Sequence, residues 1–466
     1  MTPCRITWLA AVLALGGCAL SRGGPAAPET PVPAEPEPAA YLSTYARLPS
    51  RTTLIRGASI LTAAGPVIER GSVLIRDGRI AAVGTSVTAP ADAEVIDATG
   101  KWVTPGLIDP HSHIGVGAAP GISAISDVNE ATNPNTAEVW AEHSIWPQDP
   151  QFALALAGGV TTAQLLPGSA NLFGGRTVTV KLVPVRTIDE MKFPGAPQGL
   201  KMACGENPKR VYESRGPSTR MGNMAGFRQG FVRAQRYQRE QRKWREEGAD
   251  RAKQPARDLQ LETLAEALDG RMPAQIHCYG AHEMAMMLDL AHEFGFRIGA
   301  FIHAVEAYKI RDLLKARDVC SLAWSDWWGF KLEAYDGINA NMALLEEDGA
   351  CVALHSDDSQ GIQRLNQDAA KAMTAGRQAG IEISRAAAIR WITINPAKTM
   401  GVADSTGSLE PGKMADVVIW DRDPFSIYAH AEQVFIDGAL IYDRNDPRRQ
   451  PRSDFILGIL PKETAR

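Results

Sequence analysis

The sequence predicts an α/β protein in which a large (β/α)8 TIM barrel lies beside a small composite β-sandwich formed by both ends of the chain. The chain has 466 residues and is 45% hydrophobic, which suits a large barrel carrying a second, smaller module. In the middle of the chain, short apolar strands alternate with helical segments, as in parallel βα units. A group of short strands precedes this region and a matching group follows it, so we expect the two groups to pair.

Local patterns predict the individual elements of these regions. Alternating polar and apolar residues, separated by turns such as Asp77-Gly78, predict the strands of the sandwich. These strands cover residues 53–56, 72–75, 80–83 and 94–97 near the start, and residues 416–420, 433–436 and 440–443 near the end. Residues 227–257 are rich in Arg and Lys with aromatic residues at roughly helical spacing. They predict a long solvated helix with an apolar stripe, rather than a nucleic-acid or membrane patch.

The first residues have the pattern of an export signal. A polar start is followed by an apolar run over residues 6–15, which is too short to span a bilayer as a helix. The run ends in Leu15-Gly16-Gly17-Cys18, which resembles the lipobox of bacterial lipoproteins, whose cysteine becomes the lipidated first residue. We therefore expect lipidation of Cys18 and a membrane anchor in the bacterial cell envelope, facing the periplasm or the exterior. An ordinary signal peptide with a chance cysteine is the alternative.

The domain boundaries follow from composition. Residues 19–40 are rich in Pro, Ala and Glu and bury too little apolar surface to fold, so they predict an extended tether. The expected parts are a signal peptide (1–17), the lipidated Cys18 with its tether (18–45), the sandwich (46–104 and 405–450), the barrel (105–404) and a tail (451–466). A net charge of −4 gives no reason to expect a nucleic-acid partner. A homo-oligomer is left open.

Four cysteines remain beyond the N-terminal region, at positions 204, 278, 320 and 351, and they are widely scattered with no CxxC pair. A disulfide is compatible with export, but the sequence assigns none. We expect these cysteines to be small buried hydrophobic residues in strands.

The strongest chemical signal is a strand that ends in two histidines one residue apart. His111 and His113 lie at the end of the string Thr104-Pro105-Gly106-Leu107-Ile108-Asp109-Pro110-His111-Ser112-His113. Because residues i and i+2 of a strand face the same side, both imidazoles converge on one point. Two neutral imidazoles on one side make half of a site for Zn²⁺ or a similar metal.

This string resembles the first barrel strand of the amidohydrolase superfamily. Three further strings resemble family motifs: Gly159-Val160-Thr161-Thr162, Asn395-Pro396-Ala397-Lys398 and the run over residues 407–416. From about residue 52 to 445 the chain is similar to imidazolonepropionase-like amidohydrolases, whose fold is a barrel beside a composite β-sandwich. The resemblance implies one or two divalent metals per chain, Zn²⁺ or another ion.

The resemblance also implies later metal ligands at strand ends. His277 and His303 each close an apolar strand, and their spacing fits one strand–helix–strand step. Asp357 follows the apolar residues 351–354 and leaves room for two such steps after His303. With His111 and His113 these residues fall on strands one, five, six and eight, at the rim where barrel enzymes build their active sites. In the family, the counterpart of Asp357 takes a proton from the attacking water and returns it to the leaving amine.

A fourth-strand ligand completes the site in binuclear members of the family, where a carboxylated lysine bridges two metals. Lys201, in Gly199-Leu200-Lys201-Met202-Ala203, looks most like that lysine, which makes a carboxylated Lys201 the expected bridge. Lys181 is the rival, one strand earlier, and Glu206 is a third candidate. Arg220, Tyr308 and His143 are candidate substrate contacts, since an arginine can pair bidentately with a carboxylate.

These residues predict a hydrolase of C–N bonds that acts through metal-activated water. We expect a small-molecule or peptide-like substrate, an amide in a dipeptide or an N-acyl amino acid, because an exported protein meets scavenged peptides readily. One alternative is a cyclic amidohydrolase or deaminase on the same barrel. The other is a binding lipoprotein without catalytic activity, which the intact set of ligands disfavours.

Overall fold

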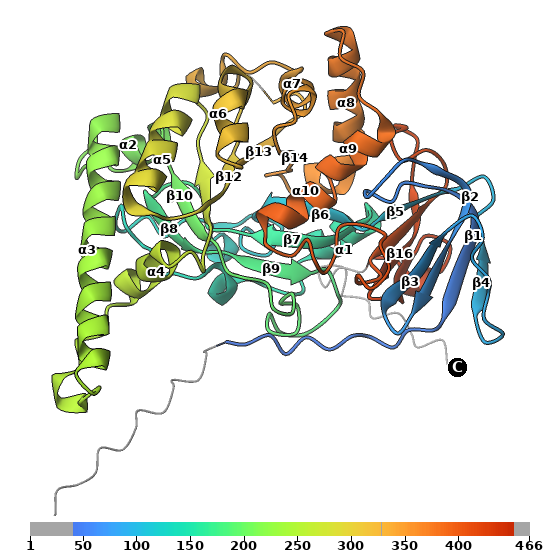
Figure 1. Cartoon of the computed structure of the whole chain (residues 1–466), viewed down its shortest axis with the longest axis horizontal. Coiled ribbons are helices and arrows are strands. Elements are labelled where there is room, and N and C mark those ends of the chain that lie inside the picture. Colours follow the sequence, from blue (N-terminus) through green and yellow to red (C-terminus); the bar gives the residue numbers. More distant parts are fainter. Residues whose placement is uncertain (1–40, 328, 452–466) are drawn as a thin grey trace, which may run out of the picture.

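The computed structural model describes residues 41–327 and 329–451 (Figure 1). The predicted signal peptide, Cys18, most of the tether and the tail after residue 451 lie outside these residues. Among the helices of the described residues, none is long and apolar enough to cross a membrane.

Strands from both ends of the chain form one eight-stranded sheet, with the blue and red strands side by side in Figure 1. Its order is β17-β16-β15-β5-β1-β2-β3, with β4 paired to β1. The strands are β1 (Thr53–Ile60), β2 (Ile68–Arg76), β3 (Arg79–Gly84), β4 (Glu94–Asp97), β5 (Trp102–Pro105), β15 (Val417–Trp420), β16 (Ala431–Ile436) and β17 (Ala439–Asp443). The antiparallel pairing of β5 with β15 joins the two ends. The domain boundaries proposed from composition stay predictions.

Two tight turns in this sheet show why its hairpins form. Asp77-Gly78 joins β2 to β3, and Asp437-Gly438 joins β16 to β17. All four of these residues have positive φ, between 46° and 75°. Two successive positive φ angles match the right-handed twist of paired strands, and Asp-Gly adopts them at low cost.

The middle of the chain forms two further sheets. A six-stranded sheet has the order β14-β13-β12-β11-β10-β8, and a three-stranded sheet has the order β6-β7-β9. Their strands are β6 (Leu107–Ser112), β7 (Val160–Leu165), β8 (Phe173–Arg176), β9 (Val178–Lys181), β10 (Leu200–Ala203), β11 (Ala274–His277), β12 (Ile298–Ile302), β13 (Cys320–Ala323) and β14 (Val352–Leu354). Strands β10 to β14 are parallel, whereas β8 and β9 run antiparallel to their neighbours. The hydrogen-bond ladders do not close into one ring, so the closed barrel stays a prediction.

Helices connect these strands. They are α1 (Pro150–Ala157), α2 (Glu206–Val211), α3 (Arg220–Glu246), α4 (Leu259–Leu268), α5 (Ala281–Phe294), α6 (Arg311–Ala316), α7 (Asn341–Glu347), α8 (Leu365–Gln378), α9 (Arg385–Trp391) and α10 (Ile394–Thr399). Helix α3 is the long basic helix that the sequence predicts. It begins and ends earlier in the chain than the predicted range of residues 227–257. Its buried Phe227 and Phe231 pack edge-on against Phe173 of β8. The helix lies at the left edge of Figure 1. Its charged residues are exposed, except Arg220, which is half-buried.

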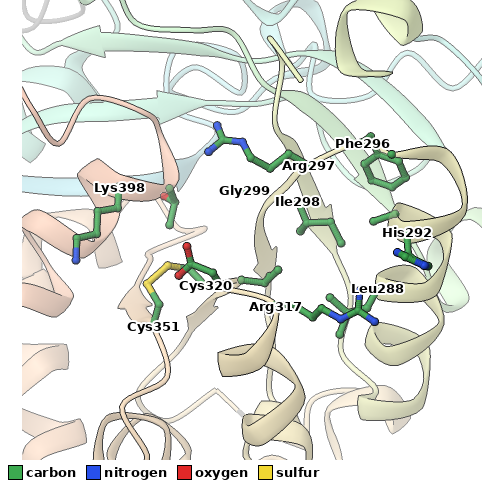
Figure 2. A pocket seen from close by; sticks show the side chains of 15 residues that line it. Leu288, His292, Phe296, Arg297, Ile298, Gly299, Arg317, Cys320, Cys351 and Lys398 are labelled. Atoms are coloured by element: carbon green, nitrogen blue, oxygen red, sulfur yellow. A yellow bond between two sulfur atoms is a disulfide. The ribbon is translucent and has the colours of Figure 1, made fainter. Parts of the chain in front are cut away.

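The expectation that the four cysteines are unpaired hydrophobic residues is wrong. Cys204 is bonded to Cys278, and Cys320 is bonded to Cys351. Each pair joins neighbouring parallel strands, with Cα atoms 5.2 Å and 4.5 Å apart. The partners are 74 and 31 residues apart in sequence, so only the strand pairing brings them together. The Cys320–Cys351 bond is visible in the wall of a surface pocket (Figure 2).

Candidate metal centre

The candidate ligands lie within or just after five strands of the central sheets. His111 lies in β6 and His113 just beyond it, and their ring centroids are 4.9 Å apart. Lys201 lies in β10 and His277 ends β11. His303 and Asp357 follow β12 and β14 and have positive φ angles of 61° and 52°. A non-glycine residue in this region is uncommon and costs energy, which is a frequent feature of functional sites.

The Asp357 carboxylate brings the histidines together. Its Oδ1 lies 3.4 Å from Nδ1 of His111 and 3.3 Å from Nε2 of His113. Its Oδ2 lies 3.7 Å from Nε2 of His303. The ring of His277 lies 4.8 Å from that of His303, between centroids. Ligand atoms of His111, His113 and Asp357 all lie within 4.8 Å of one another, a spacing that could hold a metal ion.

Lys201 points its amine into the same cluster. Its Nζ lies 2.9 Å from Nε2 of His111, and the side chain is fully buried. Burial lowers the pKa of Lys201 from 10.5 to about 7. A substantial fraction of this amine is therefore neutral near pH 7, unlike an ordinary surface lysine.

The donor set fits a divalent metal. Nδ1 of His111 and of His277 are buried and have no hydrogen-bond partner among the described residues. Nδ1–H of His113 donates to the Leu166 carbonyl at 2.8 Å, which leaves Nε2 as the free acceptor of that ring. Burial lowers the pKa of His111, His277 and His303 well below the ordinary value, so these imidazoles stay neutral. Neutral imidazole nitrogens with one carboxylate are the ligands that Zn²⁺ and similar ions take.

Asp357 is ionised in this setting. Burial opposes its charge, but electrostatic interactions with the surrounding His113, His355 and Lys201 outweigh burial and hold the pKa of Asp357 below its ordinary value. A carboxylate that is ionised at neutral pH can bind a metal and can accept a proton from water.

An open cavity of about 480 Å³ leads to these residues. His113, His277, His303 and Asp357 form part of its wall. The rest of the wall includes Asn129, Asn207, Arg210, Tyr279, Phe330 and Lys331. The pocket beside Cys320–Cys351 is separate and contains none of the predicted ligands (Figure 2).

Several residues that support the cluster were not assigned such roles from the sequence. Asp109 is fully buried and accepts hydrogen bonds from the backbone N–H groups of His111 and Ser356, each at 3.2 Å, and from the Ser356 hydroxyl. Burial raises the pKa of Asp109 to about 7. The sequence contains a signal for this role of Asp109, because Asp109 and His111 are residues i and i+2 of one strand and share a face. The bonds to Asp109 tie the end of β14 to β6.

His303 is held in place by contacts with two neighbouring rings. Its Nδ1 lies 3.2 Å from Nε2 of His355, and Trp324 stacks on its ring at a centroid distance of 4.4 Å. His355 lies two residues before Asp357 in the sequence. No local pattern signals these contacts, since Trp324 belongs to a different strand-end loop.

Lys181 lies away from the cluster. Its fully buried Nζ bonds to Asp416 at 3.1 Å and to Asp437 at 2.9 Å, both in the region of the terminal sheet. Glu206 lines the cavity, where Lys331 lies 3.6 Å from its carboxylate. Of the candidate bridging residues, only Lys201 contacts a predicted histidine ligand among the described residues.

The three candidate substrate contacts do not line the cavity. Arg220 is held by Glu283 at 3.0 Å and Glu333 at 2.9 Å. The Tyr308 hydroxyl donates to the Asp336 carbonyl at 3.1 Å. His143 is exposed and stacks on Trp140.

Comparisons with known proteins agree with this geometry. The model of the amidohydrolase family matches residues 102–441. Amidohydrolase tasK of Hapsidospora irregularis is 34% identical over 401 residues, which are 80% of this chain, and the chain spans 40% of that relative's length. Imidazolonepropionase of Rhizobium meliloti is 23% identical over 411 residues, which are 80% of this chain and 92% of that protein.

A solved structure agrees as well. An amidohydrolase from Thermotoga maritima is 35% identical, with a TM-score of 0.78, and the match covers 84% of this chain and all of that one. The family match covers most of the chain and includes every candidate metal ligand. The chain therefore belongs to the amidohydrolase family.

Proposed function

We propose that the protein is a metal-dependent hydrolase of a C–N bond, acting on the amide of a dipeptide or an N-acyl amino acid. The observation that carries the proposal is the convergence of His111, His113, Lys201, His303 and Asp357 beside an open cavity. Its volume of about 480 Å³ falls in the range of small-molecule sites. Family membership supports hydrolysis as the type of reaction.

The side chains have separate roles in this proposal. His111, His113, His277, His303 and Asp357 would hold the metal, and Lys201, carboxylated on its neutral amine, would add anionic oxygens for a second ion. Bound there, Zn²⁺ or another divalent cation would polarise the amide carbonyl and lower the pKa of a water molecule.

Asp357 moves the proton in the reaction. Its carboxylate takes a proton as the water oxygen bonds to the carbonyl carbon, and it returns the proton to the amine nitrogen as the C–N bond breaks. Because its pKa lies below the ordinary value, Asp357 is ionised at neutral pH and can accept a proton.

We propose that the two central sheets together form the (β/α)8 barrel of the family. Support comes from links between strand ends of different sheets. The Asp357 N–H donates to the His111 carbonyl at 3.3 Å, which links the end of β14 to β6. The chain itself makes a second link, because Thr177 alone separates β8 of the larger sheet from β9 of the smaller sheet.

We also propose that the protein is exported and anchored through Cys18. The lipobox-like string carries this proposal. The two disulfides support it independently, because disulfides persist in oxidising compartments and are rare in the cytosol of mesophiles.

A cyclic amidohydrolase or deaminase is the second candidate. The similarity to imidazolonepropionase over most of that protein's length favours it. The products separate the two candidates: amide hydrolysis gives a carboxylate and a free amine, deamination releases ammonia, and ring opening of a cyclic amide yields one product.

The test is a substrate screen with protein reconstituted with Zn²⁺, Mn²⁺ or Co²⁺. Dipeptides, N-acyl amino acids, cyclic amides and amino-substituted heterocycles are incubated with wild type and with the His111→Ala/His113→Ala variant. We expect wild type to release an amine from a dipeptide or N-acyl amino acid, and the variant to bind less metal and release none. Hydrolysis confined to cyclic amides or heterocycles would refute the proposed substrate. No reaction by metal-loaded wild type would favour the binding lipoprotein.

A further inference from the structure

Two cationic side chains line the cavity, and they differ in how they are neutralised. The ammonium group of Lys331 pairs with carboxylates of the protein itself. Its Nζ lies 3.3 Å from Glu333, 3.6 Å from Glu206 and 4.0 Å from the centre of the Tyr279 ring. The positive charge of Lys331 is therefore balanced by carboxylates of this chain.

The positive charge of Arg210 is not balanced by carboxylates in this way. It lies on helix α2, one turn after Glu206, so the two side chains share a face of the helix and both line the cavity. Arg210 is exposed, and its guanidinium has no ion pair or hydrogen bond to any described residue. The cation is thus available at the wall of the cavity.

Two neighbouring arginines in the β10–β11 connection, unlike Arg210, have partners within the described part of the protein. Arg215 donates to the carbonyls of Thr132 and Ala131. Arg220 pairs with Glu283 and Glu333. Arg220, which the sequence suggested for carboxylate recognition, is therefore occupied, whereas Arg210 is free and lines the cavity.

The cavity itself supplies no carboxylate to Arg210. Glu206 is paired with Lys331, and Asp357 contacts the histidines. A guanidinium presents a fixed fork of N–H donors that binds a carboxylate with two parallel hydrogen bonds. The carboxylate of a bound ligand is therefore the group that Arg210 is available to bind.

We propose that Arg210 determines substrate specificity by binding the free carboxylate of the substrate, so that the enzyme hydrolyses amides of amino acids with a free C-terminal carboxylate in preference to neutral amides. This inference rests on the proposed amide hydrolysis. Arg210 acts in substrate binding and takes no part in the proton transfer by Asp357.

The test compares matched pairs of compounds that differ only in this carboxylate. A panel of N-acetyl amino acids and the corresponding N-acetyl amino acid amides is assayed with metal-loaded wild type, and release of the acyl group is followed by mass spectrometry. The best pair is then measured with Arg210→Gln, Arg210→Lys and Lys209→Gln. Lys209 is the matched control, because it is an adjacent cation on the same helix that does not line the cavity.

We expect wild type to prefer the acid over the amide by about 10- to 100-fold in kcat/KM, the effect of a hydrogen-bonded ion pair. Arg210→Gln should lose this preference, because its KM for the acid should rise much more than its KM for the amide. Arg210→Lys should keep part of it, and Lys209→Gln should keep all of it. Equal hydrolysis of acid and amide by wild type, or equal loss for both in Arg210→Gln, would overturn the inference.

Binding separates this inference from the proposed function. Affinity for the N-acetyl amino acids is measured by calorimetry with the same variants, whether or not any compound is hydrolysed. Binding by wild type that Arg210→Gln weakens and Lys209→Gln does not would support the role of Arg210 even if hydrolysis fails. Absence of binding by wild type, or binding unaffected by Arg210→Gln, would refute it.

Discussion

The two disulfides make a matched pair of perturbations with different expected effects on the metal centre. Cys204 comes three residues after Lys201, and Cys278 directly follows His277, so this bond joins β10 and β11 next to two candidate ligands. Cys320 begins β13 and Cys351 directly precedes β14. The second bond (Figure 2) therefore lies at the amino-terminal ends of its two strands, whereas the first lies at the carboxyl-terminal ends of β10 and β11. Each pair is replaced by alanine: Cys204→Ala/Cys278→Ala and Cys320→Ala/Cys351→Ala.

The loss of stability should be similar for the two variants. The entropy of closing a loop of 74 residues corresponds to about 4.4 kcal/mol at 25 °C. A loop of 31 residues corresponds to about 3.7 kcal/mol. Each variant also loses two sulfur atoms, of which only that of Cys351 belongs to a partly buried residue. Stability alone therefore does not distinguish the two variants.

Metal binding should distinguish them. Without the Cys204–Cys278 bond, Lys201 and His277 are held less firmly relative to each other, and we expect metal affinity to fall about 10- to 100-fold, as when groups that orient ligands are removed. The Cys320–Cys351 variant should keep wild-type affinity. Urea denaturation gives the stability, and competition with a chelator gives the affinity at a temperature where both variants are folded. Equal metal affinity in the two variants would refute the positioning role of Cys204–Cys278, and unchanged stability in both would refute the loop estimate.

The remaining predictions concern the two buried lysines, pH and the anchor. Lys201→Ala should lose at least one metal per chain by elemental analysis, with activity partly restored by bicarbonate and a short carboxylic acid, whereas Lys181→Met should keep its metal. Lys181→Met should instead lose about 3–5 kcal/mol of unfolding free energy, because Asp416 and Asp437 stay buried without their cation; the reverse pattern would move the bridge to Lys181. The pKa of Lys201 falls from 10.5 in the unfolded chain to about 7, so between these values the unfolded state holds a proton that the folded state lacks. The unfolding free energy of chelator-treated protein should therefore rise as the pH increases from 7 to 10, and Lys201→Met should flatten that rise in urea titrations; an equal slope in both proteins would contradict the assigned pKa. Finally, Cys18→Ser should move the protein from the membrane to the soluble fraction on cell fractionation, and continued membrane partition would exclude lipidation at Cys18.

The sequence by itself determined the features that depend on local periodicity. The alternation of side chains in a strand places His111 and His113 on one side, and the repeating strand–helix pattern puts His277, His303 and Asp357 at strand ends. The Asp-Gly turns likewise depend only on the conformational freedom of two adjacent residues. The family predicted from the motif strings is confirmed by the match over residues 102–441.

Only the tertiary structure decided which distant residues meet. Lys181 and Lys201 both lie in short apolar strands, yet one pairs with the aspartates near the terminal sheet and the other reaches His111. The antiparallel direction of β8 and β9 and the two disulfides depend on strand pairing across long stretches of chain, which no local pattern records. Arg210 and Arg220 are alike as residue types in the same connection. The carboxylates that neutralise Arg220 come from α5 and the loop after β13. Only folding therefore leaves Arg210 at the cavity wall with no carboxylate partner among the described residues.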